Sequence, residues 1–247
     1  SFRDNQPVLD KIKERIPITL ILNLISTFLA YIIAIPLGIF SAVKQHTLAD
    51  RISTVTVFIL YSLPNFWIGT MLIIFFGGGD FLSWFPYAGL YSNNYEYLST
   101  FGKFKDLMWH LFLPVVVYTY GSFAYLSRQM RVGMLEVIRQ DFIRTARAKG
   151  LTENVVIFKH ALRNSLIPII TILAYILPAM IGGSVIIETI FTIPGMGSLA
   201  FEAITSRDYP IVMAVFTISA VLTLIGMLLA DLLYSVVDPR ITFGSKS

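Results

Sequence analysis

Hydrophobic residues gather in five long windows that carry almost no charge: residues 16–43, 52–76, 107–126, 165–187 and 211–237. About 20 apolar residues, each rising about 1.5 Å along a helix, cross a hydrocarbon core about 30 Å thick. The pattern therefore predicts five membrane-spanning helices. The third window is the weakest of the five, because His110 and Pro114 lie inside it. We expect an all-α membrane protein, a polytopic helical bundle.

Residues 128–164, between the third and fourth windows, are too polar to span a membrane and yet have helical periodicity. Apolar residues recur at that spacing at Leu135, Ile138, Phe142 and Ala146. Gly150 suits the left-handed residue that ends a helix, and Thr152 and Glu153 suit the start of a second helix running toward Pro168. Two short amphipathic helices predict a docking element. The alternative is a basic loop that lies on anionic lipid and only fixes topology.

Composition supports the membrane assignment. The chain is 55% hydrophobic and 14% charged, with a mean hydropathy of +0.72, whereas soluble domains carry about 25% charged residues. The absence of cysteine excludes disulfides, thiolate metal sites and thiol nucleophiles. The net charge of +4 is small and localised, so nucleic-acid binding is not indicated.

The basic residues predict the orientation. Twelve of the 19 lysines and arginines fall in residues 128–164, the first short loop and the C-terminal end. The positive-inside tendency places these parts, including the tail 242–247, in the cytoplasm, and residues 1–15 outside the cell. A chain that starts outside needs a preceding element to carry it across. We therefore expect a further helix before residue 1, which makes six spans.

The segment from Arg144 to Gly150 resembles the cytoplasmic coupling loop of ABC importer permeases. The general signature begins Glu-Ala-Ala, with Gly four residues after the second Ala. Ala146 and Gly150 keep this spacing, while Arg144 and Thr145 stand where Glu and Ala are usual. This form is similar to the variant found in the dipeptide/oligopeptide/nickel permease family.

The resemblance extends over residues 16–241. Three further segments are similar to motifs of that family's outer loop: Glu188-Thr189-Ile190-Phe191, Pro194-Gly195-Met196-Gly197 and Arg207-Asp208-Tyr209-Pro210. The end of the chain is similar to the family's C-terminal signature in Asp231-Leu232-Leu233-Tyr234 and Asp238-Pro239-Arg240-Ile241. On this alignment, too, the family's first helix precedes residue 1.

The resemblance implies the type I ABC importer permease fold and a place in the bacterial inner membrane. It also implies a second homologous permease, two ATP-binding subunits, an extracytoplasmic substrate-binding protein and a peptide substrate, with this chain forming half of the translocation pathway. The residues implied in ATPase coupling are Phe142, Arg144, Thr145, Ala146, Arg147, Lys149 and Gly150. Those implied in the extracytoplasmic loop or gate are Glu188, Pro194, Gly195, Gly197, Arg207, Asp208 and Tyr209. Those expected in helix packing are Asp231, Asp238 and Arg240.

Two interpretations of Glu188 stay open. Its carboxylate either faces the pathway near an outer gate or is a helix-end group hydrogen-bonded to the adjacent loop.

The chain has no phosphate-binding loop. It is therefore expected to be a non-catalytic subunit without a cofactor, with ATP and Mg²⁺ bound by partners.

Other substrates of this permease type are nickel chelates, glutathione and oligosaccharides. The alternatives of another class are a stand-alone secondary transporter or channel, and an intramembrane enzyme. The first needs intramembrane charge or an internal repeat, and the second needs paired catalytic groups within the spans; neither feature is evident in the sequence.

Overall fold

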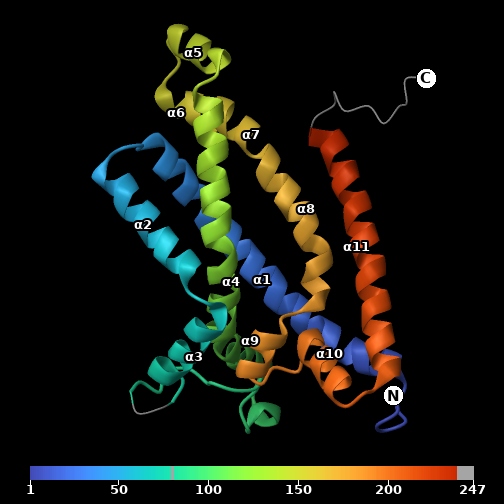
Figure 1. Cartoon of the computed structure of the whole chain (residues 1–247). Helices are drawn as coiled ribbons and strands as arrows, with labels where there is room; N and C mark the ends of the chain where they lie inside the picture. Colours follow the sequence, from blue (N-terminus) through green and yellow to red (C-terminus); the bar gives the residue numbers. More distant parts are fainter. Residues whose placement is uncertain (79–80, 238–247) are drawn as a thin grey trace, which may run out of the picture. The chain divides into compact units, whose positions relative to one another are not determined.

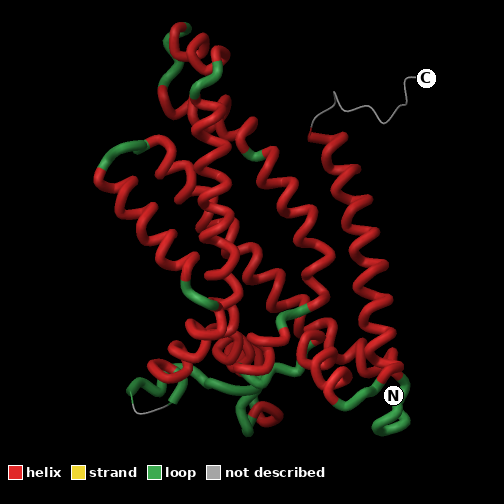
Figure 2. The backbone as a smooth tube through the Cα atoms, in the orientation of Figure 1, coloured by secondary structure: helices red, strands yellow, loops and turns green. Residues whose placement is uncertain are grey.

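The chain is helical almost throughout in the computed structural model, which describes residues 1–78 and 81–237 (Figures 1 and 2). Side chains are not described for residues 173–175, 177–179, 230–231 and 233–237. Within the described residues the only β-type pairing is an isolated bridge between Gly77 and Ser83. The expectation of an all-α membrane protein is confirmed.

Three helices are long and apolar enough to cross a membrane: α1 (Val8–Val43), α4 (Thr100–Ile138) and α11 (Tyr209–Val237, apolar over Tyr209–Leu229). They contain the first, third and fifth predicted windows. α1 begins at Val8, so about half of the expected extracytoplasmic segment 1–15 belongs to the first long helix. α4 continues past residue 126 and carries Pro114 inside it without ending. The segment that follows the third window is therefore a direct extension of the span.

The second predicted window contains two helices rather than one. α2 (Leu48–Ser62) and α3 (Asn65–Phe76) meet at an angle of 95°. Pro64 precedes α3 with an extended backbone (φ −66°, ψ 137°), and proline disfavours the helical conformation in the residue before it. The Tyr120 hydroxyl donates a hydrogen bond to the Leu63 carbonyl at 2.8 Å, which satisfies a backbone group at the break. Counted as one broken span, this pair is the fourth candidate membrane crossing among the described residues.

The fourth predicted window is also interrupted. α8 (Ile167–Gly182) is followed by Gly183 in the left-handed region (φ +65°), and α9 (Val185–Ile190) begins after it. Ser184 caps α9, its hydroxyl accepting a hydrogen bond from the Ile187 N–H at 3.4 Å. A short turn then leads to α10 (Met196–Thr205) and α11.

The segment between α4 and α8 consists of several short helices. α5 (Asp141–Ala148) is followed by α6 (Glu153–Val155), a π-helical stretch (Val156–Ala161) and α7 (Leu162–Ser165). As predicted for residues 128–164, helical segments are present both before and after Gly150. However, the first predicted helix does not run unbroken from Leu135 to Ala146, because α4 ends at Ile138 and α5 starts at Asp141.

The chain divides into two compact units, with the boundaries falling inside α1, α2, α4, α8 and α11. The first unit contains Ser1–Leu29, Ser62–Ser122 and Ala179–Val221. The second contains Ala30–Tyr61, Phe123–Pro178 and the described residues from Leu222 onward. Each unit has its own buried apolar clusters. Leu113 and Phe191 lie in a cluster of the first unit, and Met130, Met134 and Ile143 in one of the second.

Candidate functional site

α5 carries most of the residues predicted for coupling, and one face of it packs against its own unit. Ile143 and Ala146 are buried in the cluster that contains Met130 and Met134 of α4. Phe142 is 46% exposed. Of these two predicted coupling residues, Phe142 is exposed and Ala146 is not. Ala146 is covered by the protein itself, and only Phe142 of the two remains available.

Sequence reasoning missed Ile143, which is fully buried beside Ala146 on the inner face of α5. A detectable signal was present, because Ile143 and Ala146 are three residues apart and lie on one face of a helix. The break at Gln140 changes the phase between α4 and α5, so the periodicity that starts at Leu135 cannot be carried through to Ala146.

The charged and polar coupling residues form the exposed surface of α5. Arg144 lies 3.4 Å from Asp141 in an ion pair whose side chains are 74% and 94% exposed. The Thr145 hydroxyl donates to the Asp141 carbonyl at 3.0 Å. Lys149 is exposed at the C-terminal end of the helix. With Asp141 in the first turn and Arg147 in the last, the charges also suit the helix dipole.

Gly150 and an arginine–glutamate pair fix the turn after α5. Gly150 has φ +79°, as the spacing predicts, and its N–H donates to the Arg147 carbonyl at 2.9 Å. The Arg147 guanidinium donates two hydrogen bonds to the Glu153 carboxylate, at 2.7 and 3.1 Å, and lowers the pKa of Glu153. Thr152 precedes α6, but its side chain makes no capping hydrogen bond. The Arg147–Glu153 pair therefore links α5 to α6.

A further ion pair, which sequence reasoning missed, joins α1, α2 and α4 within the second unit. Arg131 of α4 donates to both oxygens of Asp50, at 2.9 and 3.1 Å, and to the Ser41 hydroxyl at 2.8 Å. Asp50 is only 4% exposed and also accepts from Ser41 Oγ and the His46 N–H. Its position next to a long apolar window was the available signal, because a carboxylate there needs a buried partner.

Glu188 is the centre of a fully enclosed hydrogen-bond cluster in the first unit. Its carboxylate has no exposed surface and accepts from the Ser198 N–H at 2.8 Å, the Ser184 N–H at 3.3 Å and the Thr19 hydroxyl at 3.3 Å. The same threonine accepts from the Met196 N–H at 2.9 Å. These contacts correspond to the second interpretation of Glu188, a carboxylate hydrogen-bonded to the adjacent loop. They tie α1, α9 and the start of α10 together.

Three glycines close to Glu188 leave space for its carboxylate. A Cβ placed on Gly183 would lie 2.2 Å from Glu188 Oε1, and one on Gly195 would lie 2.4 Å from Glu188 Cδ. Gly197 is equally restricted, with a Cβ position 2.6 Å from the Val185 nitrogen. Pro194 is half-buried in the same turn. The structure thus brings together four of the residues predicted for the outer loop or gate, Glu188, Pro194, Gly195 and Gly197, with the two glycines against the Glu188 carboxylate.

The remaining predicted residues lie apart from this cluster. Asp208 is buried at the start of α11, where it accepts from the Ser1 hydroxyl and, at 3.0 Å, from the Phe2 N–H. The Ser1 hydroxyl is the main reason that the pKa of Asp208 is lowered. Arg207 and Tyr209 are exposed on either side of it. The side chain of Asp231, and all of Asp238 and Arg240, lie outside the described residues, so their predicted packing role stays a prediction.

Comparison with known proteins gives consistent relatives. Residues 34–243 match the protein family described as "Binding-protein-dependent transport system inner membrane component". The oligopeptide transport system permease protein AppB of Bacillus subtilis (strain 168) is 46% identical over 98% of this chain and 74% of its own length. The dipeptide transport system permease protein DppB of Alkalihalophilus pseudofirmus is 36% identical over 98% of this chain and 76% of its own length.

A solved structure shows a similar fold. A chain of the MetNI methionine ABC transporter, in an inward-facing conformation, superimposes with a TM-score of 0.70 at 17% identity, covering 95% of this chain and 99% of that one. At this identity the likeness concerns the fold alone.

Proposed function

Because the chain belongs to the family of binding-protein-dependent transport system inner membrane components, we propose that it is the permease subunit of an ATP-driven importer that takes up peptides. The observation that carries the peptide assignment is the identity of 46% over 98% of the chain to an oligopeptide permease. Dipeptide and putative peptide permeases at 36–38% identity support the same class of substrate. The chain would form half of the pathway, beside a second homologous permease.

α5 is the proposed contact with an ATP-hydrolysing partner. Its outer surface offers Phe142 together with basic side chains, while Ile143 and Ala146 anchor its inner surface to α4 through Met130 and Met134. A push on α5 would therefore move the end of α4 with it, because a packed cluster transmits displacement. Exposed ion pairs contribute only about 0–1 kcal/mol each. The basic residues would accordingly orient the partner, and Phe142 would supply apolar contact.

The turn between α9 and α10 is the proposed outer closing element. Its backbone is fixed by Glu188, whose carboxylate is enclosed and hydrogen-bonded to Ser184 and Ser198. We infer that Glu188 acts by holding this turn rigid and does not itself touch the substrate. An extracytoplasmic binding protein would deliver the peptide on this side of the membrane.

Two experiments test the proposal. The tagged chain is first purified in mild detergent from its native membrane, and co-purifying proteins are identified by mass spectrometry. Recovery of a second permease and of ATPases with a phosphate-binding loop is expected. The complex is then reconstituted in liposomes with its binding protein and supplied with labelled di- and oligopeptides. Uptake that requires ATP supports the function. Uptake without ATP, or a chain that binds no ATPase even when one is supplied, contradicts it.

A further inference from the structure

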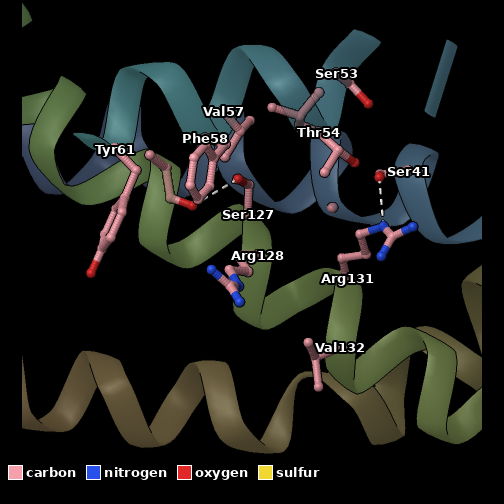
Figure 3. Close-up of a pocket in the computed structure, with 13 residues that line it drawn as sticks. Ser41, Ser53, Thr54, Val57, Phe58, Tyr61, Ser127, Arg128, Arg131 and Val132 are labelled. Atoms are coloured by element: carbon pink, nitrogen blue, oxygen red, sulfur yellow. Dashed lines mark hydrogen bonds between the residues drawn. The ribbon is translucent and has the colours of Figure 1, made fainter. Parts of the chain in front are cut away.

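A cavity in the second unit combines a polar end and an apolar end. It has a volume of about 340 Å³ and is lined by α1, α2 and α4. Ser41, Ser53 and Arg131 lie toward one end, and Phe58 and Tyr61 toward the other (Figure 3). Close packing of α1 on α4 forms one wall, because a Cβ on Gly38 would lie 2.6 Å from the Met130 Cβ. The ligand that fits such a cavity has both a polar and an apolar part.

The charges around the cavity do not balance. Arg131 is neutralised by Asp50, which accepts two hydrogen bonds from it and one from Ser41. Arg128, one helical turn earlier on α4, lines the same cavity. Among the backbone groups and side chains that the structure describes, it has no ion-pair or hydrogen-bond partner. One positive charge is therefore left over at a cavity that contains no other free ionic group among the described residues.

The surroundings of the cavity are apolar and open. Phe58 is 61% exposed, Tyr61 58% and Val132 44%, and all three border it. They lie on α2 and α4, helices that belong to candidate membrane spans. A ligand can thus enter sideways from the bilayer. A soluble anion has no apolar part that could cover these side chains.

We propose that the cavity between α1, α2 and α4 binds one anionic phospholipid, with its phosphate on Arg128 and an acyl chain along Val57, Phe58 and Tyr61. A guanidinium matches two phosphate oxygens with parallel hydrogen bonds. Basic pockets between membrane helices are a recurrent means of holding acidic lipid head groups. A lipid with one net negative charge leaves the occupied site neutral, whereas a zwitterionic lipid brings its own cation. This site is independent of the proposed transport function, because it requires neither peptide nor ATP.

Native mass spectrometry of the full chain, purified with the subunits that accompany it, tests the site. The delipidated protein is titrated with phosphatidylglycerol and, separately, with phosphatidylcholine. One phosphatidylglycerol is expected to bind in preference to phosphatidylcholine. The variant Arg128→Gln removes a charge-assisted contact and is expected to weaken this binding about tenfold. Arg139→Gln is the matched control, because Arg139 is exposed in the turn after α4 and does not line the cavity.

A second variant tests the apolar end independently of charge. Val57→Phe places a larger ring in the cavity and is expected to reduce phosphatidylglycerol binding while Arg128 is unchanged. Equal binding of the two lipids, equal loss in Arg128→Gln and Arg139→Gln, or full binding by Val57→Phe would overturn the proposal. Inorganic phosphate alone is the last probe. If it binds in an Arg128-dependent manner and displaces the lipid, the site takes a soluble anion and the lipid assignment fails.

Discussion

A single backbone torsion decides whether α5 can be followed by α6. Gly150 has φ +79°, and nothing lies within 4 Å of where its Cβ would be. A substitution is therefore costly because the new residue would be strained at this positive φ, and not because its side chain would clash. A β-branched residue in this region costs about 1–2 kcal/mol or more. We predict that Gly150→Val remains in the membrane but hydrolyses ATP in the complex without matching peptide uptake.

The control for this prediction is Gly150→Asn, because asparagine adopts the left-handed conformation more readily than other residues with a side chain. It has a side chain of similar size but a lower torsional cost, and transport by this variant is expected to stay close to that of the unchanged protein. ATPase activity and uptake are measured on the same proteoliposomes. Normal uptake by Gly150→Val would contradict the role assigned to the turn.

Glu188 and Gly195 lie against each other, so we expect their substitutions to affect stability in a coupled way. Glu188→Ala leaves three donors without an acceptor, each costing about 1–3 kcal/mol when buried, whereas Glu188→Gln keeps one acceptor oxygen. We expect thermal unfolding in detergent to shift furthest for the alanine variant. Gly195→Ala should also destabilise the protein, because its Cβ would lie 2.4 Å from Glu188 Cδ.

The combination separates packing from a direct contact with substrate. In the Glu188→Ala background the space beside Gly195 is vacant, so Gly195→Ala should cost much less there than it does alone. Strictly additive shifts in the unfolding temperature would show that the two residues do not meet. A loss of peptide uptake in Glu188→Gln without any change in stability would instead support the pathway interpretation.

For single residues, the sequence predicts the required backbone conformation better than the direction in which a side chain points. The position of Gly150 after a periodic segment was enough to predict its positive φ. The interpretation of Glu188 as a group hydrogen-bonded to the adjacent loop agrees with its contacts to Ser184 and Ser198. Thr19 was not predictable as a partner, because it is 169 residues away in the chain. Ile143 was missed as the buried residue of α5, because the break at Gln140 alters which side of the helix faces the cluster.

Among elements, the contact of α1, α2 and α4 through Asp50 and Arg131 is the clearest to test. Breaking a fully buried ion pair costs about 3–5 kcal/mol. The Arg131 side chain is 27% exposed, so we expect a smaller loss, about 2–3 kcal/mol, for Arg131→Met. Removing both charges in Asp50→Asn with Arg131→Met should restore part of this loss. The measurement is a double-mutant cycle of thermal unfolding in detergent, with Arg139→Met as the control. A double variant that loses the full sum would contradict the pairing.

The helical type of the elements followed from hydrophobicity, but their number and the breaks within them did not. A hydropathy window measures apolar content and does not require one continuous helix. The positions of prolines do not predict where a helix breaks, because Pro114 lies inside unbroken α4 while Pro64 lies at a 95° bend. At the bend, Tyr120 supplies a donor for the Leu63 carbonyl. That compensation comes from a residue distant in sequence, so no local pattern could reveal it.

At the scale of the whole molecule, the long helices differ in how much of their surface the chain itself covers. Within their most apolar stretches, half of the residues of α4 are buried, against 28% for α1 and 11% for α11. Apolar side chains that the chain leaves uncovered must face lipid or another subunit, since contact with water is unfavourable. A second permease packed against this one would cover part of that surface.

A photoactivatable probe dissolved in the bilayer measures this coverage. In the chain expressed alone, we predict that labelling per apolar residue rises from α4 to α1 to α11, in the order of decreasing burial. Co-expression with the second permease should lower labelling on α1 or α11 and leave α4 nearly unchanged, because α4 is already packed in its own chain. Soluble ATPase subunits added alone provide the control, since they should protect α5 from a water-soluble probe and leave membrane labelling as it was. If the second permease changes no labelling on either helix, both face only lipid, and the pathway cannot be built from two permeases that meet along them.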